Sequence, residues 1–245
     1  MSKNEKSLIY KKSEYNGLLY EVIASGSKGN AIKIHNILID CGIPFKNLKE
    51  HLYDVDYLLI THCHSDHLKI GVLKSIKKYF PRIHIMGNEE VANACIHEGV
   101  LLTGVLTHNQ AFVLGGTKVL PFHFPHGSTL CTAFVLYFPF LEDGILVATD
   151  GNSLENCPDE RFEMMFLEGN FCKQRIQEAF HKEQRFGYDY LNATYRHLSI
   201  QEMKRFYYTH RNDRFTPLIQ LHVSGRFGYF ISTGREKENE SSNDL

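Results

Sequence analysis

The stretch Thr61-His62-Cys63-His64-Ser65-Asp66-His67 places four side chains of metal-binding type within six consecutive positions. It follows a short apolar segment that is typical of a strand, and a helix is expected after it. Because residues at alternate positions of a strand end point the same way, His62 and His64 can share one metal ion. Asp66 and His67 lie around the bend and can reach a second ion. Imidazole and carboxylate suit zinc, so the stretch predicts a metal site rather than a polar loop with clustered histidines.

Apolar periodicity and turn residues on both sides of this stretch predict alternating strands and helices. A Ser-Gly-rich turn separates the first two strands, and Ser199 with Glu202 forms a capping box at the start of the last helix. Two similar halves of this kind favour a four-layer αββα sandwich of the α/β class. Strands are expected at 20–24, 31–40, 57–61, 83–86, 131–139, 145–149, 164–167 and 218–222, and helices at 68–80, 89–98, 173–182 and 199–210. Residues 112–124 are expected to be rich in strand, with a turn at Gly115-Gly116.

The composition is that of one globular domain. The 245 residues are 43% hydrophobic, and a formal charge of -1 argues against a generally basic nucleic-acid binder. No apolar run approaches the roughly 18 residues of a membrane helix, and the polar N-terminus lacks a signal-peptide core. A cytoplasmic location with reduced cysteines is therefore expected. We expect a polar N-terminal extension at 1–18, a single domain at 19–233 and a disordered tail at 234–245.

The histidine-rich stretch resembles the HxHxDH motif of the metallo-β-lactamase superfamily. Other features of that family occur in the same order. Residues 37–42 resemble its LIDxG strand, and residues 121–126 resemble the region of its third histidine. Residues 147–150 resemble the strand that ends in its bridging aspartate, and residues 218–222 resemble the strand that carries its last histidine. The resemblance spans residues 20–227. It implies the αββα sandwich of the metallo-β-lactamase fold with two divalent metal ions, zinc first and manganese as the alternative.

The resemblance also implies a set of metal ligands. One ion would be held by His62, His64 and His126, the other by Asp66, His67 and His222, with Asp150 between them. His123 lies three positions before His126 and competes with it. Taken alone, a histidine at a strand end is more often hydrogen-bonded than metal-bound, and Asp150 also fits an ordinary turn. Asp40 is expected to orient a ligand rather than to bind metal.

Further segments resemble the phosphodiesterase branch of the superfamily, which includes ribonuclease Z and the WalJ (YycJ) exonucleases. Residues 24–30 and 166–170 resemble the ASGSSGN and LExN segments of WalJ, and residues 197–199 and 222–227 resemble the HST and HFSxRY segments of ribonuclease Z. In that family a glutamate and a histidine pair near the leaving group, which implies Glu168 and His197 as a proton-donating pair. The alternative is a buried strand-end Glu and a helix N-terminal His. With Asp66, these two are the implied catalytic residues.

The same segments supply candidate contacts to substrate phosphate, which are Ser27, Lys28, Asn30, Ser224 and Arg226. A plain β-turn explains the Ser-Gly-rich turn equally well. Gly127 departs from the aspartate that the family commonly has after its third histidine, and no Gly/Pro-rich arm for tRNA is found. Pre-tRNA processing is therefore not expected, and the chain resembles divergent phage-encoded members of the WalJ group.

These features favour a two-metal phosphodiesterase that acts as a nuclease on DNA or RNA. The alternatives are a cyclic mononucleotide phosphodiesterase similar to the phage anti-Pycsar enzymes, another small-molecule metallohydrolase, and a non-catalytic metal-binding module. The expected partner is a nucleic acid or a nucleotide, and no membrane partner is expected. The expected location is the cytoplasm, or the host cytoplasm for a phage protein. A homodimer is left open. A basic rim is a further hypothesis, weighed against solvated helix faces, from Lys69, Lys74, Lys77, Lys78, Arg205, Arg211, Arg214 and Arg226.

Overall fold

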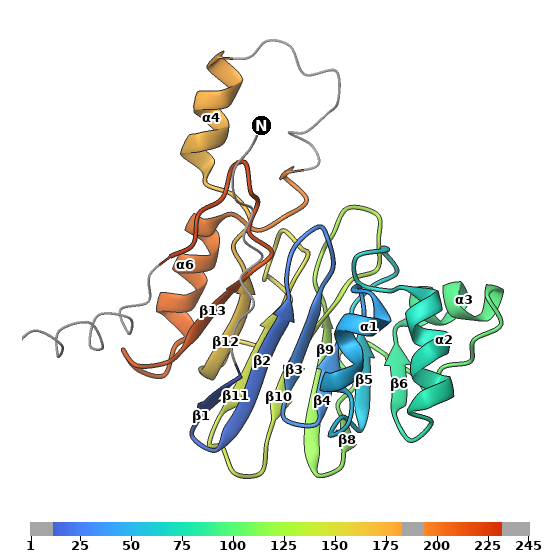
Figure 1. Cartoon of the computed structure of the whole chain (residues 1–245). Helices are drawn as coiled ribbons and strands as arrows, with labels where there is room; N and C mark the ends of the chain where they lie inside the picture. The colour runs from blue at the N-terminus through green and yellow to red at the C-terminus, as the bar shows by residue number, and fades with distance from the viewer. Residues whose placement is uncertain (1–11, 183–193, 232–245) are drawn as a thin grey trace, which may run out of the picture.

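Two β-sheets lie face to face in the computed structural model, which describes residues 12–182 and 194–231, and helices cover their outer faces (Figure 1). Three apolar clusters separate the layers: one between the sheets, one under the helices of the first half and one under the helix of the second half. The predicted αββα sandwich is therefore confirmed. No helix in the described ranges is long and apolar enough to cross a membrane.

The first sheet has its strands in chain order, antiparallel from β1 to β4 and parallel from β4 to β7. These strands are β1 (Ser13–Tyr15), β2 (Leu18–Ala24), β3 (Ala31–Ile34), β4 (Ile37–Ile39), β5 (Tyr57–Ile60), β6 (His84–Gly87) and β7 (Gly104–Val105). The parallel half is connected through helices, as parallel strands require.

The second sheet has the order β13-β12-β11-β10-β9-β8 and also mixes both kinds of pairing. Its strands are β8 (Phe112–Leu114), β9 (Thr117–His123), β10 (Thr132–Tyr137), β11 (Gly144–Ala148), β12 (Phe162–Glu168) and β13 (Leu218–Leu221). Strands β11, β12 and β13 are parallel to one another. Because parallel strands end at one edge of a sheet, the residues that follow them gather there, as they do after β4 and β5.

The central strands are buried on both faces, which explains their continuous apolar runs. In β5, Leu59 joins the cluster between the sheets, whereas Leu58 and Ile60 join the cluster under the helices. In β10, Phe134 faces the other sheet and Val135 faces the helix layer. Alternate side chains of a strand point to opposite faces, so β5 and β10 each contribute to two of these apolar clusters.

The helices present one apolar side to the sheets. On the first sheet lie α1 (Phe45–Leu48), the 3₁₀ turn η1 (Lys49–His51), α2 (Ile70–Tyr79) and α3 (Glu89–His97); α4 (Lys173–Lys182) and α6 (Ile200–His210) belong to the second half. Helix α2 buries Val72, Leu73 and Ile76, an i, i+1, i+4 pattern that fits one face. The capping box of Ser199 and Glu202 is present at the start of α6, as predicted.

The observed elements differ from the expected ones in three respects. Residues 31–40 form two strands instead of one, because a two-residue turn at His35 and Asn36, with a φ of 54° at His35, reverses the chain. Strand β1 lies inside the expected extension 1–18 and pairs with β2, so the sheet begins before the expected domain boundary. Strand β7 and helix α1 are too short to leave a periodic pattern. The expected tail at 234–245 lies outside the described residues.

Candidate metal centre

All seven predicted metal ligands meet at the edge where β5, β11 and β13 end. The first group that could hold a metal ion contains His62, His64, His126 and Asp150, and the second contains Asp66, His67, Asp150 and His222. In each group the ligand atoms lie within 4.8 Å of one another. Asp150 belongs to both of these groups, where a bridging ligand would lie. It also belongs, with Glu168, His197 and His222, to a third group whose ligand-type atoms lie equally close together.

The first group is built from the histidine-rich stretch and the loop after β9. His62 Nε2 lies 3.0 Å from His64 Nδ1 and 3.7 Å from Asp150 Oδ2. The Nδ1 atom of His126 lies 3.2 Å from the backbone oxygen of Arg196, which leaves its Nε2 for the group. His123 instead stacks on His108, with ring centroids 5.6 Å apart. Of the two competing histidines, His126 is the one that enters the group.

The second group gathers around the carboxylate of Asp150. His67 Nε2 lies 3.0 Å from Asp150 Oδ2 and 3.8 Å from Asp66 Oδ2. His222 Nε2 lies 3.9 Å from the same Asp66 oxygen. Asp66 is the more exposed carboxylate, with 22% of its side chain accessible against 4% for Asp150. The second group therefore opens to solvent on the Asp66 side.

Three residues of the centre have left-handed backbone conformations. Asp40, Asp150 and His222 have φ values of 64°, 60° and 47°. Each follows the end of a strand, β4, β11 and β13 respectively. Such conformations cost on the order of 1–3 kcal/mol each for residues other than glycine, and they persist where the surroundings fix them. Strain concentrated at one edge of the sandwich is typical of a functional site.

Asp40 orients a ligand, as expected, without entering either group. Its Oδ2 lies 2.6 Å from His67 Nδ1, and its Oδ1 accepts a hydrogen bond of 2.9 Å from the backbone of Thr61. Both Asp40 and His67 are fully buried. A carboxylate at Nδ1 fixes the ring and its tautomer, so that Nε2 is directed toward a metal ion.

Replacing Asp40 with asparagine is expected to weaken metal binding by about 10–100-fold, the usual effect of losing a residue that orients a ligand. The loss should appear in competition with a chromophoric chelator. Asp159→Asn is the matched control, because the Asp159 side chain is fully exposed. Metal affinity equal to that of the unaltered protein would show that Asp40 serves folding alone.

Polar residues that the sequence analysis missed hold the two ligand-bearing loops together. Asn88 caps α3 by accepting a bond from Val91, while its Nδ2 donates to the backbone oxygens of Thr61 and Leu130 at 3.1 and 2.6 Å. Glu90 accepts a bond from the Leu130 backbone and one from the thiol of Cys63. The cap of α3 could be read from the sequence. The contacts to Leu130 link residues about 40 positions apart and leave no local pattern.

The predicted pair of Glu168 and His197 lies directly beside the second group. His197 Nδ1 is 2.7 Å from Glu168 Oε1 and 3.8 Å from Asp150 Oδ1. Glu168 is fully buried, contacts His222 Nδ1 at 3.1 Å and accepts a bond from the backbone of Gly151. Burial lowers the pKa of His197, but the Glu168 carboxylate raises it by more, so the net shift is upward. The arrangement favours a protonated imidazole.

The charges of the centre favour a bound cation. Burial lowers the pKa of His67, but Asp150 and Asp40 raise it by more, to about 10. The pKa of His222 is raised well above its usual value because Asp150 outweighs the effect of burial. In the first group, burial and neighbouring imidazoles lower the pKa of His62. Neutral imidazoles on one side and carboxylates on the other form a set that can bind a divalent ion.

The unmade hydrogen bonds at the centre fit a divalent metal ion. Among residues 12–182 and 194–231, buried His222 Nε2 has no hydrogen-bond partner. Asp150 Oδ1 accepts no hydrogen bond from them, although it lies 2.9 Å from His222 Nδ1. Buried polar atoms are nearly always satisfied in proteins. Both atoms belong to residues of the second group. The donor set of imidazole nitrogens and carboxylate oxygens suits zinc and other divalent transition metals.

The candidate phosphate contacts are placed differently from one another. Ser27 and Lys28 are exposed, whereas Asn30 is buried and its Nδ2 lies 2.8 Å from His67 Nε2. Asn30 thus faces the metal groups and not the solvent, and its contact with substrate phosphate stays a prediction. The Ser224 hydroxyl oxygen accepts hydrogen bonds from the backbone N–H groups of Arg226 and Phe227. The Arg226 guanidinium lies over the Phe227 ring.

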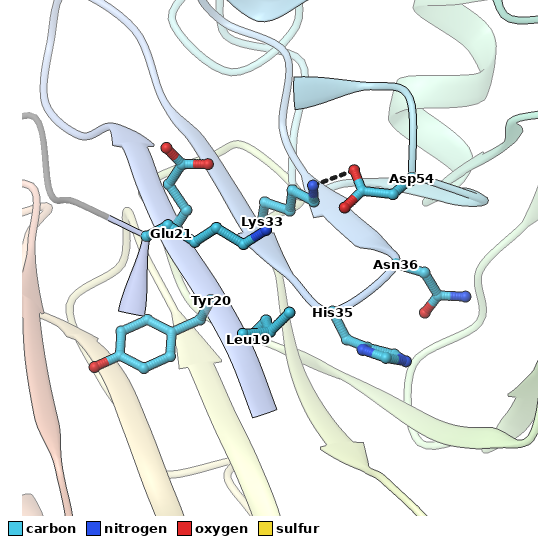
Figure 2. A pocket seen from close by; sticks show the side chains of 8 residues that line it. Leu19, Tyr20, Glu21, Lys33, His35, Asn36 and Asp54 are labelled. Atoms are coloured by element: carbon cyan, nitrogen blue, oxygen red, sulfur yellow. Dashed lines mark hydrogen bonds and ion pairs between the residues drawn. The ribbon is translucent and has the colours of Figure 1, made fainter. Parts of the chain in front are cut away.

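Arg211 and Lys74, two members of the hypothetical basic rim, have other surroundings. Arg211 bridges to Phe162, at the start of β12, whereas Glu168 at the end of that strand belongs to the centre. On α2, Lys74 pairs with exposed Glu98. A hollow drawn in Figure 2, where Lys33 pairs with Asp54, is lined by residues outside the metal groups. Positive charge in these places does not surround the centre.

Solved structures with the same architecture identify the fold. The metallo-β-lactamase fold protein YhfI from Bacillus subtilis has a TM-score of 0.62 at 16% identity, covering 88% of each chain. The short form of human tRNase Z has a TM-score of 0.59 at 15% identity, covering 85% of this chain and 93% of that one. The chain therefore has the metallo-β-lactamase fold.

The sequence also resembles named proteins of that fold, although no family model matches it. Over 118 residues it is 34% identical to exodeoxyribonuclease YycJ of Bacillus anthracis. The matched segment covers 43% of this chain and 42% of the relative. The match thus spans less than half the length of the curated relative. The expected resemblance to the WalJ (YycJ) group is confirmed, and no comparison bears on a phage origin.

Proposed function

We propose that the chain is a two-metal phosphodiesterase that cleaves nucleic acid, with DNA as its preferred substrate. The observation that carries this proposal is the contact of His197 with Glu168 next to Asp150, at 2.7 and 3.8 Å. Hydrolysis of a phosphodiester expels an alkoxide, which needs a proton, and a His held by a carboxylate can supply it. The names of the YycJ and WalJ relatives, both exodeoxyribonucleases, favour DNA.

Each of the two groups of predicted ligands would hold one metal ion. In this proposal His62, His64 and His126 would hold one ion, Asp66, His67 and His222 would hold the other, and Asp150 would serve both. Zinc is the expected occupant, and manganese is the alternative. Bound ions would supply hydroxide near neutral pH and stabilise charge on the phosphate.

The residues beside the ions direct the proton to the leaving group. Glu168 holds Nδ1 of His197, so the proton-donating atom is Nε2 on the other side of the ring. The His197 side chain is 18% exposed, whereas Glu168 is fully buried. His197 can therefore reach a substrate while Glu168 fixes its orientation. Gly151 donates its backbone N–H to Glu168 and holds the carboxylate in place.

A cyclic mononucleotide phosphodiesterase is the second candidate. The formal charge of -1 and the position of Arg211 away from the centre favour a small substrate over a long strand. Salt separates the two candidates, because contacts to several backbone phosphates make binding strongly salt-dependent, whereas binding of a mononucleotide depends on salt only weakly.

A substrate panel with added zinc or manganese tests the proposal. We expect metal-dependent cleavage of linear DNA and of bis-p-nitrophenyl phosphate, and no appreciable hydrolysis of β-lactams or thioesters. The panel should include RNA and cyclic mononucleotides, and the double variant His62→Ala/Asp66→Ala as the metal-site control. Cleavage of S-lactoylglutathione without cleavage of any phosphodiester would show that the proposal is wrong.

A further inference from the structure

Arg196 lies between two functional parts of the candidate centre. Its backbone oxygen lies 3.2 Å from Nδ1 of the predicted ligand His126, and the next residue along the chain is His197. The turn that carries it is closed by a bond from the backbone of His197 to that of Thr194. Arg196 is exposed, so its side chain is available at the mouth of the centre.

The side chain of Arg196 runs over the residue that follows His126. A Cβ atom built on Gly127 would lie 3.4 Å from Cδ and 3.5 Å from Nε of Arg196. Gly127 also has a φ of +60°, a conformation that favours glycine. The missing side chain at position 127 leaves room for the arginine stem, which rests against the loop carrying His126. The guanidinium is thereby held beside the first metal group.

The guanidinium of Arg196 has no acidic partner within the part of the chain that the structure describes. The nearby carboxylate of Glu168 is engaged by His197 and Gly151. A guanidinium offers its N–H groups in a planar fork that matches two phosphate oxygens. An exposed guanidinium beside a phosphodiesterase site suits a phosphate of the substrate.

The side chain of Tyr195, in the same turn, makes a different contact. Its ring is 55% exposed and meets Phe171 edge to face at 6.0 Å, while Asn152 donates to its backbone oxygen at 3.2 Å. Phe171 packs with Ile176 of α4, away from the loop that Arg196 covers. The Tyr195 ring therefore contacts Phe171, whereas the Arg196 stem contacts the loop that carries His126. An exposed ring supported at its edge leaves a face on which a nucleic-acid base can stack.

We propose that Tyr195 and Arg196 form a ledge that binds a single-stranded end of nucleic acid across the centre. Arg196 binds the phosphate next to the one that is cleaved, and Tyr195 stacks on an unpaired base. This inference rests on the proposed function and names the form of its substrate. A duplex would have to fray to reach the ledge, because a paired base does not expose its face.

Binding of a phosphorothioate oligothymidylate, followed by fluorescence anisotropy at several salt concentrations, tests the ledge apart from turnover. Arg196→Gln keeps a stem over Gly127 and should weaken binding about 10-fold or more. The slope of the logarithm of affinity against the logarithm of salt concentration should fall by the amount expected for about one phosphate contact. Tyr195→Ala should weaken binding about 10-fold, and Tyr195→Phe should not, because stacking needs the ring and not the hydroxyl. Arg161→Gln, at an exposed position directly before β12, and Tyr208→Ala, exposed on α6, are the matched controls.

The outcomes separate the ledge from the proposed function. Metal content equal to that of the unaltered protein would show that the variants are folded at the centre. Equal affinity and salt slope for Arg196→Gln and the unaltered protein would overturn the role of Arg196, and equal affinity for Tyr195→Ala would overturn stacking. Failure of the proposed function would appear instead as no metal-dependent phosphodiester cleavage by the unaltered protein.

Discussion

The variant Asp150→Ala is expected to lose turnover of phosphodiesters by about three orders of magnitude or more, because bound metal ions supply several kcal/mol of transition-state stabilisation. Asp150 is the one residue that the two predicted ligand groups share. Its Oδ2 lies 3.0 Å from His67 Nε2 and 3.7 Å from His62 Nε2. Its removal therefore deprives both ions of a ligand and leaves the imidazoles of His67 and His222 without their main counter-charge.

Elemental analysis of protein purified without chelator measures this prediction alongside the rate. We expect two transition-metal ions in each unaltered chain and a reduced content in Asp150→Ala. Asp159→Ala removes an exposed carboxylate and should retain both ions. Full metal content together with full turnover in Asp150→Ala would contradict the bridging role.

Replacing His197 with alanine is expected to lower turnover of nucleic acid by about 10²–10⁴-fold, the usual contribution of a general acid. Metal content should stay unchanged, because His197 contacts Glu168 and is not one of the predicted ligands. Glu168→Gln should cost a similar factor, and the double variant little more, since residues that act as a unit are not additive. His97→Ala, at the exposed end of α3, is the control.

A substrate with a good leaving group isolates the proton transfer. The p-nitrophenolate of bis-p-nitrophenyl phosphate needs little protonation, so the loss caused by His197→Ala should shrink sharply on it. Equal losses on this substrate and on DNA would assign His197 another task, such as holding a phosphate.

The residues after the parallel strands could be predicted from the sequence because their positions follow from local geometry. The strand before His62 and the alternation of His62 and His64 are visible within seven residues. Asp150 and His222 follow apolar runs that end at the same edge. The continuous apolar runs also indicated strands buried on both faces, which is the four-layer arrangement observed.

The parts that could not be predicted depend on contacts between distant segments. Asn88 reaches Leu130, and the Arg196 backbone reaches His126 across 70 positions. The contact of the Asn30 side chain with His67 also joins segments 37 positions apart. The hairpin at His35 lacks the Asn-Gly or Gly-Gly signal of a tight turn, so its two strands were merged into one.

Titration of metal-depleted protein with zinc or manganese, with hydrolysis of bis-p-nitrophenyl phosphate as the readout, tests the central claim most directly. The two-metal centre predicts that turnover rises with added metal and reaches its plateau when two ions are bound to each chain. It also predicts that Asp150→Ala stays inactive throughout the titration. A protein that binds the metal and hydrolyses no phosphodiester at any metal content would contradict the claim.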